Sequence, residues 1–186
     1  MRDLIKPAVV LFVVAAIAAG LLGYVNAITA EPIAKSEADA KAANMAAVLD
    51  CDEWGEAVEV SDSIITDYSE GKKDGKTAGY AFSVTTKGYG SGLKLMVGIN
   101  PEGTITGLSI VDCSSETPGL GANASKPEFY EQFAGKSGEL NVIKSGTAGE
   151  SDIQALTGAT ITSRAVTNGV NTVTEYFNEN LKGGAN

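Results

Sequence analysis

The sequence predicts an α+β protein: a single N-terminal transmembrane helix, then an extracytoplasmic domain with a mainly antiparallel sheet and packed helices. Three observations predict this class. Residues 7–30 carry no charge, residues 57–111 alternate apolar and polar side chains between tight turns, and the last 20 or so residues repeat apolar side chains at helical spacing. Few helical residues fit between the strands, so successive strands should pair antiparallel.

The N-terminal run is long enough to cross a membrane, because about 20 apolar residues span the hydrocarbon core. Arg2 and Lys6 precede the run and favour a cytoplasmic N-terminus, although Lys35 and Lys41 follow on the other side. A cleaved signal peptide is the competing interpretation, since residues 25–27 (VNA) are small enough for a signal peptidase. The length of the run favours a retained single-pass anchor in the cell membrane, with the C-terminal domain on the extracytoplasmic side.

The chain then divides into three predicted parts: an anchor at 1–30, a helical stalk at 31–50 and a globular domain at 51–186. The stalk is predicted from Pro32, which suits a first helical turn, and from its content of strong helix formers.

Within the domain, an Asp74-Gly75 pair predicts a hairpin turn, and strands are expected around it. Tyr80, Phe82 and Val84 alternate with small or polar residues, as in a half-buried strand. Further strands are predicted at 93–97, 104–111 and 139–143, and helices at 126–133 and 163–181.

Composition excludes several kinds of function. Fourteen basic residues against 23 acidic ones give a formal net charge of −9, which disfavours nucleic-acid binding. The chain has no histidine and two cysteines, too few for a histidine-based triad or a four-cysteine metal site. No metal site and no catalytic acid or base is predicted, so the chemistry should come from a bound cofactor. A Cys51–Cys113 disulfide is possible outside the cytoplasm, but the spacing leaves it open.

Residues 157–160 (TGAT) are the first candidate site. They place Thr157 and Thr160 around Gly158 and Ala159, directly before the last predicted helix. A helix start offers unpaired amide groups to a phosphate, and the two small residues allow close approach. Alternatively, the threonines only cap the helix.

Two glycine-containing loops are further candidates. Residues 116–121 (ETPGLG) can lay backbone amides and Leu120 along a flat ring. Residues 87–92 (KGYGSG) either connect two strands or bring Tyr89 to such a ring.

The segment 152–163 resembles the flavinylation motif of the FMN-binding domain family of the Rnf and Nqr electron-transport complexes, and 116–121 resembles that family's second signature loop. The resemblance implies FMN joined through a phosphoester to Thr160, with Thr157, Gly158 and Ala159 beside it. It also implies that Glu116, Thr117, Leu120 and Gly121 line the isoalloxazine pocket. Ala155 and Leu156 separate Asp152-Ile-Gln from Thr157, a departure from the family spacing.

The resemblance further implies a function. The expected role is an electron-carrier subunit, most like the G subunit of the Rnf complex, which passes electrons between ferredoxin and NAD while ions cross the membrane. Its expected partners are the other subunits of that complex and, because no histidine activates Thr160, a magnesium-using, FAD-dependent flavin transferase. The alternatives are the C subunit of the sodium-translocating NADH:quinone reductase and a membrane-anchored scaffold module without a redox role.

Overall fold

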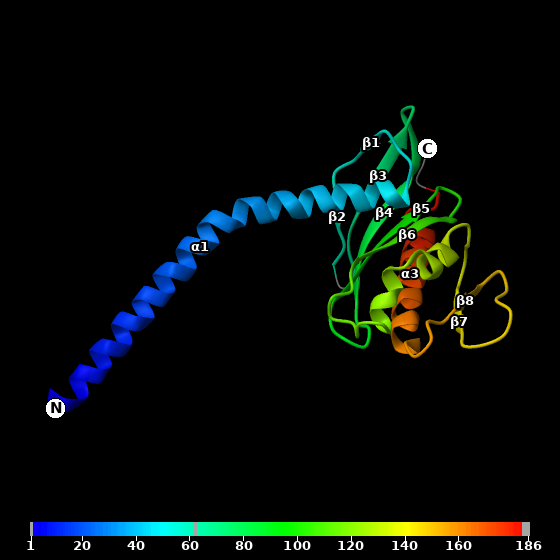
Figure 1. The fold of residues 1–186 in the computed structure, drawn as a ribbon. Helices are drawn as coiled ribbons and strands as arrows, with labels where there is room; N and C mark the ends of the chain where they lie inside the picture. Colours follow the sequence, from blue (N-terminus) through cyan, green and yellow to red (C-terminus); the bar gives the residue numbers. More distant parts are fainter. Residues whose placement is uncertain (1, 62, 184–186) are drawn as a thin grey trace. The chain divides into compact units, whose positions relative to one another are not determined.

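The protein is described here by a computed structural model, which describes residues 2–61 and 63–183. The predicted fold class is confirmed: one long apolar helix is followed by a domain of antiparallel strands and a few helices (Figure 1). Contacts divide the chain into two units, Met1–Ala42 and Ala43–Asn186. The boundaries predicted at residues 30 and 50 stay predictions. The predicted anchor begins at Met1 and the predicted globular domain ends with 184–186, and these residues lie outside those that the structure describes.

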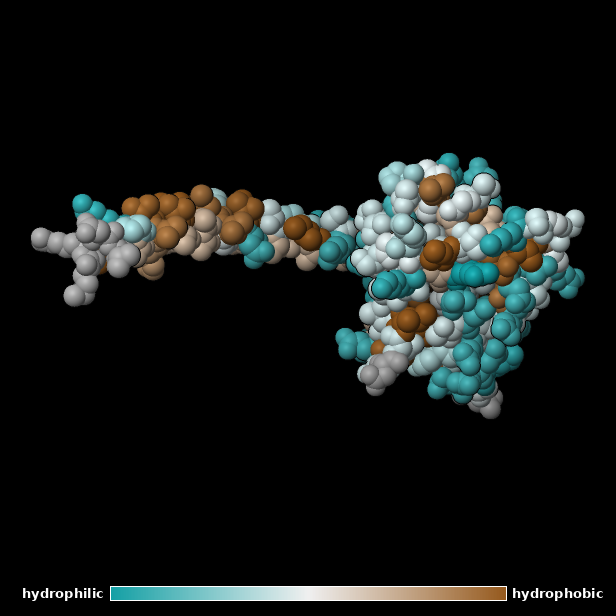
Figure 2. All heavy atoms as spheres, turned by 90° about the horizontal axis from the view of Figure 1, so that it is seen from below, coloured by the Kyte–Doolittle hydropathy of each residue, from teal (hydrophilic) through white to brown (hydrophobic). Residues whose placement is uncertain are grey.

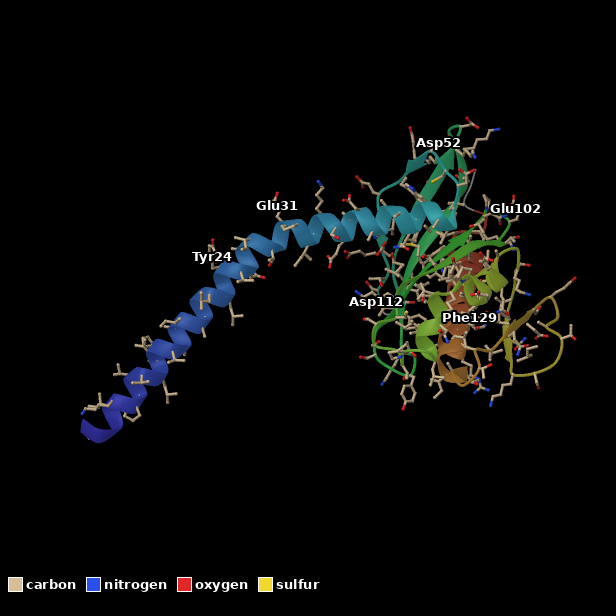
Figure 3. All side chains as sticks on the ribbon, in the orientation of Figure 1. Tyr24, Glu31, Asp52, Glu102, Asp112 and Phe129 are labelled. Carbon is tan, nitrogen blue, oxygen red and sulfur yellow. The ribbon has the colours of Figure 1, made fainter. Side chains whose placement is uncertain are left out.

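Helix α1 (Arg2–Val48) is continuous through the predicted anchor and stalk. It is long and apolar enough to cross a membrane. Figure 2 shows apolar side chains along this part of the helix. Pro32 lies inside α1 and cannot donate to the preceding turn. Figure 3 shows α1 changing direction between Tyr24 and Glu31, one turn before this proline, as expected for a proline kink.

The domain is built on a six-stranded antiparallel sheet. Its strands are β1 (Glu53–Trp54), β2 (Val58–Glu59), β3 (Ile65–Lys73), β4 (Lys76–Thr86), β5 (Leu93–Ile99) and β6 (Ile105–Asp112). The order is β1-β3-β4-β5-β6, with β2 also paired to β3. Asp74 and Gly75 form the β3–β4 turn with positive φ angles of 52° and 74°, which confirms the predicted hairpin.

Helix α3 (Thr160–Asn180) covers one face of this sheet and packs on β3, β4 and β5. Its predicted apolar stripe, Val166, Val170, Val173 and Phe177, is fully buried against strand residues such as Phe82. The segments η1 (Gly121–Ser125), α2 (Pro127–Tyr130) and η2 (Glu131–Phe133) complete this layer, and Phe129, labelled in Figure 3, belongs to the same core. The start of α3 is therefore held rigidly by the main core.

The last turn of α1 belongs to the domain and covers the opposite face of the sheet. Met45 and Val48 pack with Ala81 and Met96 in a second, smaller core. Gly98 and Gly107 face each other on β5 and β6. A Cβ on Gly98 would collide with the Val48 carbonyl oxygen, and one on Gly107 would crowd the Val48 Cα atom at 3.0 Å. The domain thus has three layers, with the sheet in the middle.

The structure corrects three predicted elements. Helix α3 begins at Thr160 instead of Ser163, so the threonine motif enters the helix. The helix predicted at 126–133 is the short α2 followed by η2, and the strand predicted at 139–143 is β7 (Asn141–Ile143). Strand β8 (Asp152–Gln154) was not predicted; it pairs parallel with β7, and a three-residue strand is too short to show a period in the sequence.

Cys51 and Cys113 are both free thiols, so the disulfide that the sequence left open is not formed. The Cys113 thiol faces the Ala122 carbonyl oxygen at 3.8 Å, while Cys51 lies beside Gly71 and β3. Burial raises the pKa of the Cys51 thiol, and the carboxylates of Asp50 and Asp52 raise it further. A raised pKa disfavours the thiolate, which is the reactive form of cysteine.

Candidate functional site

Three segments far apart in the sequence meet at a cleft of about 510 Å³. The first is the β4–β5 connection, the second is the loop that leaves β6 after Asp112 (labelled in Figure 3), and the third is the start of α3. Ser114 donates hydrogen bonds that hold the pKa of Asp112 below its usual value and turn the chain into the second segment. The cleft is lined by Tyr89, Glu116, Thr117, Leu120, Gly121, Gly158, Ala159, Thr160, Ile161 and Thr162.

The start of α3 presents unpaired amide groups to this cleft. Ala159 stands at the N-cap position without a side-chain capping hydrogen bond, and the first helical bond joins the Ser163 amide to the Ala159 carbonyl at 3.0 Å. The amides of Thr160, Ile161 and Thr162 precede that bond and so have no helical acceptor. Because the helix is 21 residues long, its N-terminus carries the full partial positive charge of a helix dipole. This terminus suits a phosphate group.

Glycine lets the two signature motifs contact each other. Gly158 has a φ of +75° and lies so close to Leu120 that a Cβ would stand 3.0 Å from the leucine Cδ2 atom. Gly121 is buried, and a Cβ there would lie 2.6 Å from the Thr162 hydroxyl oxygen. A side chain at Gly121 would separate the loop from the helix start, and one at Gly158 would strain the positive φ and displace the Leu120 side chain. The two glycines therefore fix the shape of the cleft.

The carboxylate of Glu116 joins all three segments. It is 3% exposed. One oxygen accepts a hydrogen bond from the Gly90 amide at 3.0 Å, and the other accepts one from the Thr162 hydroxyl at 2.5 Å. Gly88 and Gly121 lie directly against these oxygens, with no room for a Cβ. Through these two hydrogen bonds, Glu116 joins its own loop, which follows β6, to the β4–β5 connection and to the start of α3.

The structure brings together nearly all of the residues predicted for the site. Of the predicted set, Thr157 is the exception: it is exposed on the turn before Gly158 and does not line the cleft. Tyr89 lines the cleft with 72% of its surface exposed, and Leu120 does so with 42% exposed. Glu116, which the resemblance places in the pocket lining, already has protein hydrogen-bond partners for both carboxylate oxygens.

Sequence reasoning missed Ile161 and Thr162. Both stand in the first turn of α3, which was predicted to begin after them. A helix placed from Thr160 onward would have put both side chains at the uncapped helix terminus. Residues 160–163 (TITS) are rich in β-branched and hydroxyl side chains, which gave no local sign of that start.

The hydroxyl groups at the helix start differ in their bonding. Thr162 donates to Glu116, while Ser163 donates to the Ala159 carbonyl and accepts from the Leu156 amide. Thr160 is half-buried in the cleft wall, and within the described chain its hydroxyl has no hydrogen-bond partner. Neither Thr160 nor Thr157 caps the helix, so the capping interpretation of the motif is wrong.

This fold, with a partly apolar cleft that ends at an uncapped helix terminus, fits the class of proteins that bind a ligand with both an apolar part and a phosphate. Comparison with known families identifies that class. Residues 88–175, which include every residue of the cleft, match the FMN-binding domain family, and residues 1–48 match the RnfG N-terminal region.

Two individual relatives show to which family of protein subunits the chain belongs. The G subunit of the Na(+)-translocating ferredoxin:NAD(+) oxidoreductase complex of Acetobacterium woodii is 40% identical, over 89% of this chain and 87% of that protein. The G subunit of the proton-translocating ferredoxin:NAD(+) oxidoreductase complex of Clostridium ljungdahlii is 43% identical, over 59% of this chain and 58% of that protein. The chain belongs to the RnfG family, the G subunits of ion-translocating oxidoreductase complexes.

A solved structure supports the fold. NqrC of Shewanella oneidensis superposes with a TM-score of 0.51 over 63% of this chain and 63% of its own, at 21% identity. The match to the RnfG N-terminal region separates this chain from the sodium-translocating NADH:quinone reductase alternative.

Proposed function

We propose that this chain is the electron-carrying subunit of a membrane complex that passes electrons between ferredoxin and NAD and couples the transfer to ion translocation, with FMN joined covalently to Thr160. Membership of the RnfG family supports the complex and the reaction. The observation that supports the attachment site is the hydrogen bonding of the hydroxyl groups at the start of α3. Thr160 and Thr162 both line the cleft there, but the Thr162 hydroxyl is bonded to Glu116, so the Thr160 hydroxyl is the one available for the ester.

The charge of the cleft also supports a covalent ester. Glu116 is the one charged side chain among the lining residues, so neither lysine nor arginine neutralises a phosphate there. Free FMN carries a phosphate monoester of nearly two negative charges, whereas a phosphodiester to Thr160 carries one. The partial charge of a helix terminus, roughly half an elementary charge, suits the ester better. Covalent attachment would also keep the cofactor on the protein outside the cytoplasm, where a free cofactor would diffuse away.

The attachment requires another enzyme, because the chain has no histidine and the one carboxylate in the cleft is already bonded. In the proposed reaction, the Thr160 hydroxyl oxygen bonds to the FMN phosphorus of FAD, the pyrophosphate bond breaks, AMP leaves and the hydroxyl proton is released. A magnesium-using flavin transferase would supply the metal and the base.

The remaining residues would bind and orient the cofactor. The amides of Thr160, Ile161 and Thr162 would donate to the phosphate, and Leu120 and Tyr89 offer apolar surface to the flavin ring. Thr117, exposed in the loop, would provide a hydrogen bond to the ring edge. Bound FMN supplies one- and two-electron transfer. With no substrate acid or base in the cleft, the chain's residues serve binding and positioning.

A denaturing gel tests the covalent bond. The chain, co-expressed with the flavin transferase, should give a band that fluoresces under ultraviolet light, and its intact mass should exceed the polypeptide mass by one FMN less one water. Noncovalent cofactor would be lost on denaturation. Unmodified mass in protein purified with an active transferase would refute covalent binding, and an absence of flavin before denaturation would favour the scaffold alternative.

We also propose that the domain lies on the extracytoplasmic side of the cell membrane. Arg2 and Lys6 precede the apolar part of α1 and favour a cytoplasmic N-terminus. Protease added to intact spheroplasts should then digest the domain and leave cytoplasmic proteins whole. Digestion only after lysis would reverse the assignment.

A further inference from the structure

Strand β6 is an open edge of the main sheet. Its inner side pairs with β5, and among the described residues its outer side makes backbone hydrogen bonds only at Ile105, with Lys136 and Gly135. Beyond Ile105, no segment of the described chain pairs with that outer side. On this outer side, residues 106–111 therefore keep a row of backbone donors and acceptors that no strand of the described chain satisfies.

A groove of about 480 Å³ runs along this edge. Consecutive β6 residues, 106–110, line it. Successive side chains of a strand point to opposite faces, so a groove lined by consecutive residues follows the edge of the strand and not a face. Ala47 at the end of α1 stands on one side, and the other side is formed by Ser125, Tyr130, Glu131 and Ala134. The result is a slot whose floor is the free strand edge.

The two edge strands of the main sheet differ in length and in charge. The opposite edge ends in β1, a strand of two residues that includes Glu53, and short, charged edge strands resist pairing. Strand β6 has eight residues, and from Ile105 to Val111 it contains no charge and no proline (ITGLSIV). Neither a short strand nor a proline nor a charge before Asp112 protects this edge of the main sheet against strand addition.

Charge indicates what can fill the slot. Glu131 is the one carboxylate among its lining residues, and Asp112 ends the strand, with hydrogen bonds that keep it ionised. A second copy of this chain would bring another formal charge of −9, so like charges oppose self-pairing. A basic segment is the complementary occupant.

We propose that β6 receives an extended segment of another subunit of the membrane complex, which adds a strand to the sheet and places a lysine or arginine against Glu131. Backbone hydrogen bonds to residues 106–111 would give the segment its direction, and the groove beside Tyr130 would take an alternate side chain. This inference rests on membership in a multi-subunit complex and is independent of the flavin.

Hydrogen exchange of the full-length chain tests the added strand. Alone in detergent, the outward-facing amides in residues 106–111 should exchange freely, and in the purified complex they should slow by about tenfold or more, as paired amides do. Central strand β4 serves as the internal reference, because it is paired on both sides in either state. Equal exchange of residues 106–111 in the two samples would overturn the proposal.

A charge reversal identifies the partner's chemistry. Glu131→Lys should weaken recovery of the other subunits with this chain by about tenfold in low salt. Glu128→Lys, an exposed glutamate three residues away that does not line the groove, is the matched control and should leave recovery unchanged. Both variants should keep the fluorescent flavin band, so a failure here is distinct from a failure of the cofactor assignment.

A crosslinker distinguishes the occupants. A photoreactive residue at Ala134, exposed in the groove wall, should crosslink within the complex to a lysine- or arginine-containing peptide of another subunit. A crosslink to a second copy of this chain, or unchanged recovery with Glu131→Lys, would overturn the proposed partner.

Discussion

Replacing Thr160 with alanine should abolish the covalent flavin. The variant loses the one oxygen to which the phosphate is proposed to be joined, while the cleft and the helix start remain, because the Thr160 hydroxyl has no hydrogen-bond partner within the described chain. Stability should change by less than about 0.5 kcal/mol, as for other substitutions that break no contact. In-gel fluorescence and intact mass measure the flavin, and thermal unfolding measures stability.

Thr157→Ala is the matched control. Thr157 carries the same hydroxyl three residues earlier, in an exposed turn that does not line the cleft. This variant should keep a full complement of flavin. If fluorescence survives in Thr160→Ala and disappears in Thr157→Ala, the ester lies on the other threonine; if both single variants keep the flavin, neither hydroxyl alone is the site.

Replacing Glu116 with alanine should cost about 2–3 kcal/mol of folding free energy, since it leaves a buried hydroxyl and a backbone amide without their charged acceptor. Without the carboxylate, the β4–β5 connection should no longer be joined to the helix start. The fraction of the chain that carries flavin should therefore fall. Urea unfolding of the detergent-solubilised chain, followed by the fluorescence of Trp54, its single tryptophan, measures the first effect. In-gel fluorescence measures the second.

Two further variants separate the causes. Glu116→Gln keeps an acceptor for the Gly90 amide, and its NH₂ group can donate to the Thr162 hydroxyl oxygen, so it should cost less than about 1 kcal/mol. Glu102→Ala removes an exposed carboxylate, labelled in Figure 3, in the β5–β6 turn and should change stability little. A Glu116→Ala variant as stable as Glu102→Ala would show that the buried carboxylate does not hold the three segments together.

Local patterns in the chain predicted most of the fold. A two-residue period marked the strands, Asp74-Gly75 marked a turn that needs positive φ, and the stripe from Val166 to Phe177 marked the buried face of α3. Each of these signals depends on neighbours within a few residues, so it can be read without the tertiary structure. Elements with weak local signals were missed or misplaced, as with the short strand β8 and the start of α3.

The sequence by itself determined which residues could serve the cofactor: the Gly158-Ala159-Thr160 motif, the loop with Leu120 and Gly121, and the apolar anchor. Only the tertiary structure decided their roles. Glu116 reaches partners 26 and 46 residues away, Thr162 is engaged while Thr160 is available, and one edge of the sheet stays open. Such relations arise from long-range packing, because a hydrogen bond between distant residues leaves no period or spacing in the chain for a local pattern to reveal.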